Sequence, residues 1–228
     1  MELIPVVTID GPSGSGKGTV SRLVAKELDW HYLDSGALYR VLALAAQNHG
    51  IALDDADALG TLAAHLDVQF CIAEDPADDR VELEGENVTA ALRTEACGNA
   101  ASQIAVIPEV RQALLERQRA FQQSPGLVAE GRDMGTVVFT DALTKVFITA
   151  TPEARAERRY KQLKQKGLSG NLADVLQDIA ERDKRDAGRA VAPLKPADDA
   201  AIVDTTELSI EAVVEKILRI IDLQSTEA

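Results

Sequence analysis

The fold is decided by residues 11–19, which read Gly11-Pro12-Ser13-Gly14-Ser15-Gly16-Lys17-Gly18-Thr19. Glycines let a backbone curl so that successive N–H groups face one anion, and a helix that follows adds its positive N-terminal end. An apolar run over residues 4–9 predicts a strand before this loop, and the spacing of Val20, Val24 and Leu28 predicts a helix after it. Strand, glycine loop and helix together indicate a phosphate-binding loop, although a turn that merely happens to be rich in glycine would have the same pattern.

Lys17 is the cation of this loop, placed to neutralise charge on the β- and γ-phosphates of ATP. The usual motif has Ser or Thr directly after the lysine, whereas Gly18 fills that position here and Thr19 follows. Thr19 is therefore a candidate to contact a phosphate, or a Mg²⁺ ion through water, and we assign no direct metal ligand. All nine residues of the loop are predicted to bind ATP.

Strands alternate with helical patterns towards both ends of the chain. A brief extended piece is expected at residues 30–33, and further buried strands are expected at residues 127–129, 145–150 and 200–203. Helices are expected at residues 17–28, 35–48 and 108–121. Another helix is expected from Thr151-Pro152-Glu153, which combine an N-cap, a first-turn proline and a first-turn acid. This alternation predicts an α/β fold, a parallel sheet flanked by helices on both faces.

The middle of the chain has a different pattern. Residues 67–72 and 81–84 have the composition of two strands joined by the acidic turn AEDPADD. We therefore expect a small insertion at about residues 63–103 that is partly built of antiparallel strands.

The chain is acidic, with 24 Lys and Arg against 37 Asp and Glu and a net charge of −13 over 228 residues. Such a surface repels nucleic acids and anionic membranes. No signal-peptide pattern and no long apolar run is present, and Cys71 and Cys97 do not resemble a disulfide framework. We expect a soluble cytoplasmic protein in which any phosphate site is built locally from arginines.

Two of the clusters that could bind a second substrate follow predicted strands. Asp34 to Arg40 read DSGALYR, in which Ser35 and Arg40 could bind a phosphate, or could be a plain helix cap and a solvated arginine. Arg132 and Asp133 follow the strand at 127–129. The planar fork of arginine suits a phosphate, but an internal Arg–Asp pair that stiffens the loop is the alternative.

Two further clusters lie on predicted helices. Arg182, Asp186 and Arg189 share one face if their helix extends that far, although such a charged run is often just a solvated face. Arg155, Arg158 and Arg159 lie with Lys161, Lys164 and Lys166 on a helix ahead of Gly167 and Gly170, a candidate hinge. A basic lid of this kind would exclude water during phosphoryl transfer, and surface solubility is the alternative explanation.

Four motifs in order resemble the bacterial cytidylate kinases across nearly the whole chain: IDGPSGSGKGT, LDSGALYR, EGRDMGT and ERDKRDAGRAVAPL. The resemblance implies a P-loop nucleoside monophosphate kinase fold, with ATP and Mg²⁺ as cofactors and CMP and dCMP as substrates. It also implies a core at 1–34, 104–151 and 190–228, a monophosphate-binding domain at 35–103, and a lid with its adjoining helix at 152–189. We expect a monomer.

The resemblance also assigns roles to residues. Ser35, Arg40 and Arg132 would lie around the acceptor phosphate, with Arg189 nearby, while Asp133, Arg182 and Asp186 would lie around the sugar and base. Ser102 and Arg111 fall where the family reads the cytosine, and Lys17, Arg132 and Arg189 would be catalytic. Two other functions remain open at this point: a kinase for another small acceptor, and a nucleotide-binding switch without catalysis.

Overall fold

The computed structural model describes residues 4–71, 79–165 and 171–227. These residues form two compact units. The first consists of Met1–Asp34 together with Gln118–Ala228, and the second is Ser35–Arg117. The predicted division into core, monophosphate-binding domain and lid remains a prediction.

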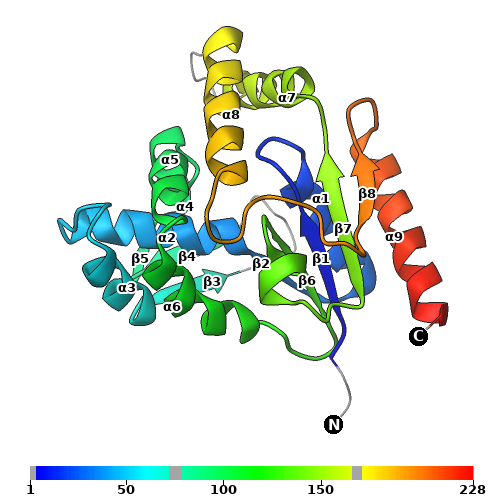
Figure 1. The fold of residues 1–228 in the computed structure, drawn as a ribbon, viewed down its shortest axis with the longest axis horizontal. Helices are drawn as coiled ribbons and strands as arrows, with labels where there is room; N and C mark the ends of the chain where they lie inside the picture. Colours follow the sequence, from blue (N-terminus) through cyan, green and yellow to red (C-terminus); the bar gives the residue numbers. More distant parts are fainter. Residues whose placement is uncertain (1–3, 72–78, 166–170, 228) are drawn as a thin grey trace. The chain divides into compact units, whose positions relative to one another are not determined.

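The first unit is built on a five-stranded sheet in the order β2-β6-β1-β7-β8, in which every neighbouring pair is parallel (Figure 1). Its strands are β1 (Val6–Asp10), β2 (His31–Asp34), β6 (Leu127–Gly131), β7 (Thr144–Thr149) and β8 (Ala201–Asp204). All residues of β1 and β6 are buried, as expected for central strands of a sheet covered on both faces. The predicted parallel α/β sheet is confirmed.

The strand register explains where a site can form. Asp10 pairs with Gly131, and Asp34 pairs with Glu130, so β1, β6 and β2 end at the same edge of the sheet. The glycine loop and Arg132 follow β1 and β6 directly. The register therefore brings residues that are far apart in the sequence to one edge of the sheet. In open parallel sheets, ligands bind at this carboxyl edge.

The helices of the first unit are α1 (Lys17–Leu28), α7 (Pro152–Gln165), α8 (Leu172–Ala187) and α9 (Ile210–Glu227), with a short π-helical segment, η2 (Met134–Val138). Helix α1 packs against α9 and β6, and α7 packs against α8. The backbone N–H of Ala154 donates to Thr151 Oγ1 at 3.3 Å, so Thr151 caps α7 as predicted. The proposed hinge at residues 167–170 lies outside the described residues.

The second unit combines helices with a small antiparallel sheet. Its strands are β3 (Val68–Cys71), β4 (Arg80–Leu83) and β5 (Glu86–Asn87), in the order β3-β4-β5. Its helices are α2 (Ser35–Asn48), α3 (Ala56–Ala64), α4 (Thr89–Leu92), α5 (Glu95–Ile104) and most of α6 (Pro108–Arg119). The predicted antiparallel strands are therefore present, while most of the acidic turn between them lies outside the described residues.

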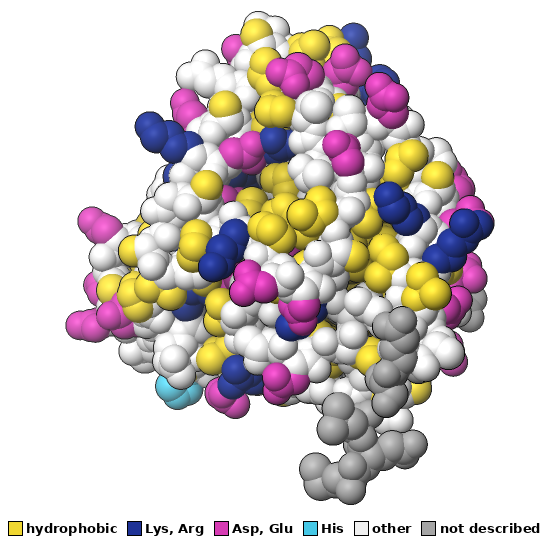
Figure 2. Space-filling view, turned by 45° about the vertical axis from the view of Figure 1, so that its right-hand side comes forward, with side chains coloured by type: hydrophobic (Ala, Val, Ile, Leu, Met, Phe, Trp, Pro, Cys, Tyr) yellow, Lys and Arg dark blue, Asp and Glu magenta, His cyan; other side chains and the backbone are white. Residues whose placement is uncertain are grey.

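Each unit has its own apolar core. In the first, Val7, Ile9 and Ile148 of the sheet pack with Val20 of α1 and Ile217 of α9. In the second, a cluster of buried side chains is centred on α2 and includes Leu42 and Leu59. On the face drawn in Figure 2, acidic and basic side chains are interspersed, and the basic ones form no continuous patch.

Candidate active site

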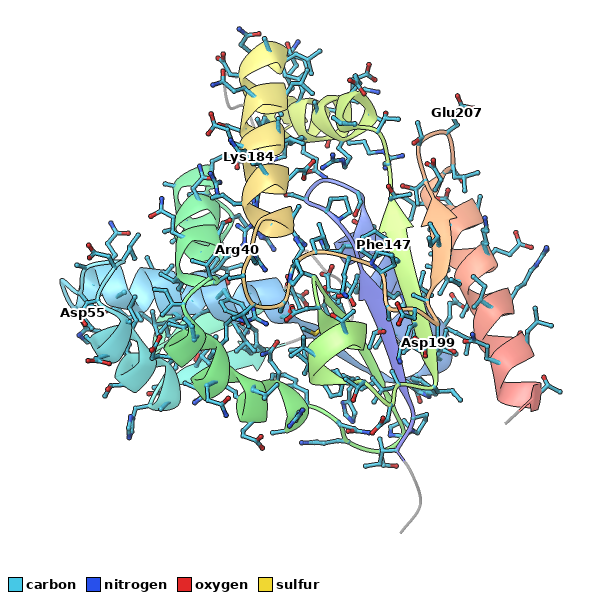
Figure 3. The ribbon with its side chains drawn as sticks, viewed as in Figure 1. Arg40, Asp55, Phe147, Lys184, Asp199 and Glu207 are labelled. Atoms are coloured by element: carbon cyan, nitrogen blue, oxygen red, sulfur yellow. The ribbon has the colours of Figure 1, made fainter. Side chains whose placement is uncertain are left out.

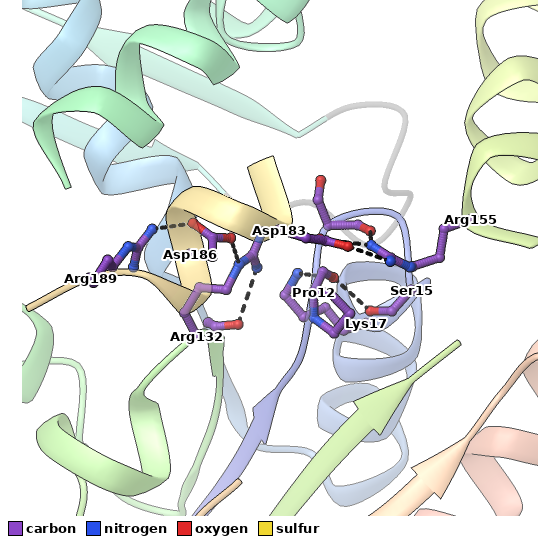
Figure 4. A network of polar contacts seen from close by, with 10 residues as sticks. Pro12, Ser15, Lys17, Arg132, Arg155, Asp183, Asp186 and Arg189 are labelled. Atoms are coloured by element: carbon purple, nitrogen blue, oxygen red, sulfur yellow. Dashed lines mark hydrogen bonds and ion pairs between the residues drawn. The ribbon is translucent and has the colours of Figure 1, made fainter. Parts of the chain in front are cut away.

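The glycine loop connects β1 to α1 and is closed by its own hydrogen bonds. Ser15 Oγ and Lys17 Nζ donate to the carbonyl of Pro12, at 3.0 and 3.3 Å (Figure 4). Gly16 precedes α1 with φ 87°, a left-handed conformation that favours glycine, and no side chain caps the helix there. The first N–H groups of α1 are therefore left for an anion.

Lys17 lies in an environment that weakens its charge. Desolvation lowers the pKa of Lys17 to about 7, and the nearby charge of Arg132 also lowers this pKa, while the carboxylates of Glu130 and Asp34 act in the opposite direction. The side chain nevertheless keeps partial exposure. A bound phosphate would favour the ammonium form, which makes Lys17 a cation that a nucleotide can stabilise.

Glu130 is a buried carboxylate beside the loop. It is 4% exposed and accepts a 2.6 Å hydrogen bond from the hydroxyl of Tyr32 on β2. Burial, reinforced by the charge of Asp34, raises the pKa of Glu130, and burial together with Glu130 raises the pKa of Tyr32, which keeps that phenol a donor.

The unusual glycine after Lys17 has a steric explanation. A Cβ added to Gly18 would lie 3.0 Å from Glu130 Oε1, closer than most side-chain contacts allow. The motif's Ser or Thr would therefore compete with Glu130 for the same space.

Asp10 ties the end of β1 to the segment that follows β6. Its two carboxylate oxygens accept hydrogen bonds from the backbone N–H groups of Met134 and Gly135, each at 2.9 Å. Burial raises the pKa of Asp10 to about 6, despite these two donors. The contact fixes the chain just after Arg132 and Asp133, and Asp133 is itself 5% exposed.

Arg132, Asp186 and Arg189 form one ion-pair cluster (Figure 4). Arg132 Nε and Arg189 Nη2 donate to different oxygens of Asp186, at 2.8 and 2.5 Å. Burial alone would raise the pKa of Asp186, but the charges of Arg132 and Arg189 outweigh it and lower that pKa. Helix α8 ends at Ala187, so it does not extend far enough for Arg189 to share a helical face with Arg182 and Asp186. Gly188 ends the helix, and Arg189 reaches Asp186 from beyond it.

Two of the three predicted lid arginines, Arg155 and Arg158, are held against the glycine loop. Arg155 is buried and donates to the carbonyls of Ala150 and Ser13, while Arg158 donates to the carbonyl of Ser15 and to Thr205. Arg159 donates instead to Gln162 on its own helix. Contact of these arginines with a transferring phosphoryl group remains a prediction.

Four predicted acceptor residues belong to the second unit. Ser35 and Arg40 lie on α2, and Arg40, labelled in Figure 3, donates to the carbonyl of Leu92 at 2.6 Å. Ser102 on α5 and Arg111 on α6 are buried, and Arg111 donates to the carbonyl of Ala105. Since α2 packs against α5, Ser102 and Arg40 lie on neighbouring helices.

Within the described residues, the structure contains no preformed metal site, no membrane-spanning helix and no disulfide. No group of three or more His, Cys, Asp or Glu side chains in those ranges is arranged to hold a metal ion. Within the same ranges, every helix is too short or too polar to cross a bilayer. Both cysteines are free, Cys71 exposed and Cys97 buried.

Sequence reasoning missed four polar residues beside the site: Asp10, Tyr32, Asp183 and Thr205. Thr205, which is 2% exposed, donates to the carbonyls of Ser15 and Thr149. Two of the four carried a usable signal, because Asp10 and Thr205 stand at the carboxyl ends of parallel strands, where sites form. Asp183 lies within the charged run ERDKRDAGRAVAPL but received no role of its own, and Tyr32 has no local signal.

The parallel sheet, the glycine loop on the N-terminus of α1 and Lys17 define a P-loop phosphotransferase. A crystal structure of a gluconokinase from Sinorhizobium meliloti 1021 resembles the chain with a TM-score of 0.52 at 14% identity, covering 100% of this chain and 97% of that one. An uncharacterised protein from Eubacterium ventriosum gives a TM-score of 0.51 at 12% identity, covering 96% and 99%. At such low identity these likenesses show the fold alone.

The sequence comparisons identify the family. The profile of the cytidylate kinase family matches residues 7–223. A cytidylate kinase from Pseudomonas paraeruginosa is 61% identical over 94% of both chains, and one from Pseudomonas syringae pv. tomato is 62% identical over 96% of both. The chain belongs to the cytidylate kinase family.

Proposed function

We propose that this protein transfers the γ-phosphoryl group of ATP to CMP and dCMP, forming ADP and the corresponding diphosphate. One observation carries the proposal: within one compact unit, a helix N-terminus with Lys17 and a cluster of arginines stand at the same carboxyl edge of the sheet. Two anions held by these two groups would meet at that edge. Family membership favours this reaction over another acceptor or a switch without catalysis.

The acceptor phosphate is assigned to Arg132 and Arg189 and, on the family resemblance, to Ser35 and Arg40. Arg189 Nε is buried and lacks a hydrogen-bond partner among the described residues, so a phosphate oxygen would satisfy it. Asp133, Arg182 and Asp186 are assigned to the sugar and base. Ser102 and Arg111 are assigned to the cytosine edge, where an unmatched buried donor would penalise another base.

The chemistry needs little from general bases. A phosphate oxygen of the acceptor is already anionic, so it can attack the γ-phosphorus in line once the two nucleotides are aligned. Lys17, the amides of the loop, Arg132 and Arg189 supply alignment and neutralise the charge that develops on the transferred group.

Mg²⁺ fits this site as an ion held mainly by nucleotide phosphates and water. Magnesium commonly binds in this way, with few protein ligands, and the described residues contain no cluster built to hold a metal alone. Thr19, exposed in the first turn of α1, is the residue that we assign to contact a phosphate, or the ion through water. When bound, the ion would screen the charge of the phosphates.

Three further properties belong to the same proposal. We assign a monomer that binds neither nucleic acid nor membranes, as its charge of −13 suggests. Free cysteines suit a reducing compartment such as the cytoplasm. The proposal also includes a lid role for Arg155, Arg158 and Arg159, which would contact the transferring phosphoryl group. It includes the predicted limits of the core, the monophosphate-binding domain and the lid.

The test is a panel of acceptors assayed for ADP formation with ATP and Mg²⁺. CMP and dCMP should support turnover, whereas AMP, gluconate and shikimate should not. Turnover confined to a sugar acid would replace the proposed acceptor. Nucleotide binding with no turnover on any acceptor would indicate the switch instead.

A further inference from the structure

Arg155 joins the glycine loop to helix α8. Its Nη1 donates to the carbonyl of Ser13 at 3.1 Å and to Asp183 Oδ1 at 2.9 Å, and its Nη2 donates to Asp183 Oδ2 at 2.5 Å (Figure 4). The side chain of Arg155 is 4% exposed and that of Asp183 30% exposed. A bidentate Arg–carboxylate pair of this kind fixes orientation as well as distance.

The same turn of α8 also holds the arginine cluster. Asp183 and Asp186 are three residues apart, so they are neighbours on the helix surface. Asp183 binds Arg155 on the side of the glycine loop, while Asp186 binds Arg132 and Arg189. One helical turn therefore touches both groups that the proposed function assigns to the two nucleotides.

The loop has little room to move independently of Arg155. A Cβ added to Gly14 would lie 3.2 Å from Arg155 Cβ, so the backbone of the loop rests on this side chain. Arg155 also donates through Nε to the carbonyl of Ala150 at 3.1 Å, directly after the end of β7. The same guanidinium nitrogen, Nη1, thus binds both Asp183 of α8 and the Ser13 carbonyl of the loop.

We propose that Arg155 and Asp183 are a positioning pair that couples the two substrate sites, so that an acceptor nucleotide bound at the Asp186 cluster increases affinity for the donor nucleotide at the glycine loop. The inference rests on the proposed function. The structure pairs these two side chains with each other and joins Arg155 to the Ser13 carbonyl, and this pairing, which is separate from the lid role proposed for Arg155, is what positions the loop. An acceptor nucleotide that binds at Asp186 would restrict the motion of this turn of α8. Asp183 would then stay paired with Arg155, and the glycine loop would stay in the conformation that binds the donor. Donor binding would therefore lose less conformational entropy.

The experiment measures binding of AMP-PNP with Mg²⁺ by calorimetry, with and without saturating CMP. In the wild type, CMP should tighten AMP-PNP binding by about 5-fold or more, the lower end of typical coupling. In Asp183→Asn this ratio should fall to about 1, while each ligand alone binds within about 3-fold of wild type. Arg155→Lys, which keeps the charge but loses the fork, should also lose the ratio. Glu181→Gln, an exposed carboxylate two residues away on α8, is the matched control and should keep it.

The outcomes separate the inference from the function on which it rests. A wild-type ratio of 1, or an unchanged ratio in both Asp183→Asn and Arg155→Lys, overturns the coupling. Loss of the ratio in Glu181→Gln as well would overturn the assignment to this pair. Failure of CMP to bind the wild type at all would instead overturn the proposed function, and the inference with it. Thermal melting of each variant distinguishes lost coupling from lost folding.

Discussion

The glycine loop and the Asp186 cluster prepare for an anion in different ways. The loop relies on backbone N–H groups at the start of α1, with one ammonium beside them. The cluster relies on two guanidinium groups that a buried carboxylate already holds. Backbone dipoles are fixed by the fold, whereas the side chains of the cluster need Asp186 to stay in place. The donor site is thus built by main-chain geometry and the acceptor site by charge pairing.

This difference determines how a substitution in each site should affect binding and turnover. Removing the Lys17 ammonium from the loop leaves the backbone amides in position, but it removes the positive charge that neutralises the transferred phosphoryl group. Removing Arg132 leaves Asp186 buried with one partner fewer, which also disturbs Arg189. The following predictions use this contrast.

The largest effect is expected for Lys17→Ala. The loop should still form, so CMP binding should persist, but kcat should fall by about 10³-fold, as for the loss of one group that stabilises a transition state. Steady-state turnover and CMP calorimetry check the two statements. Turnover near the wild-type value would remove Lys17 from the mechanism.

Arg132→Ala should have the next largest effect, lowering kcat/KM for CMP by about 10²-fold, with the KM for ATP changed far less. Arg219→Ala is the matched control, because Arg219 forms an exposed pair with Glu215 on α9 and should leave both values unchanged. An equal loss for ATP and CMP would mean that Arg132 does not belong to the acceptor side.

The contrast between the glycine loop and the Asp186 cluster also explains which parts of the fold and site could be predicted from the sequence. The strand, the glycine loop and α1 were predictable because their pattern is local, and the predicted helix over 17–28 matches α1 residue for residue. The parallel sheet followed from strands alternating with helices, and the two antiparallel strands of the insertion followed from their own composition.

Contacts between distant segments could not be predicted. Tyr32 and Glu130 are 98 positions apart, and Arg155 meets the Ser13 carbonyl across 142 positions. Arg189 pairs with Asp186 from beyond the end of α8, where helical spacing no longer places side chains. The roles given to Ser102 and Arg111 came from resemblance alone and stay a prediction.

Gly18→Ser would restore the usual motif and should nevertheless lower kcat by about 10-fold, because the new Cβ crowds Glu130. Glu27→Ser, which places a serine at an exposed position in the last turn of the same helix, is the control and should stay close to the wild type. Full activity of Gly18→Ser would show that Glu130 yields without cost, and higher activity would contradict the steric explanation.

The smallest effect concerns pH. Since the pKa of Lys17 is lowered to about 7 in the free protein, phosphates bound beside it should raise that pKa, and binding should take up a proton. Affinity for AMP-PNP should therefore fall as pH rises above 7, by at most about 10-fold per unit. Calorimetry at pH 8 in buffers of different ionisation enthalpy measures the uptake.

Two variants sharpen this measurement. Lys17→Ala should take up fewer protons than the wild type, while the exposed Lys216→Ala should take up the same number. Binding enthalpies that do not depend on the buffer would contradict the assignment of a lowered pKa to Lys17.

The most direct test of the account follows all phosphorus nuclei in one tube. Wild-type protein with ATP, CMP and Mg²⁺ should give ³¹P spectra in which CDP and ADP grow at equal rates and inorganic phosphate does not accumulate. Release of inorganic phosphate without CDP would contradict direct transfer between two anions held at the edge of the sheet.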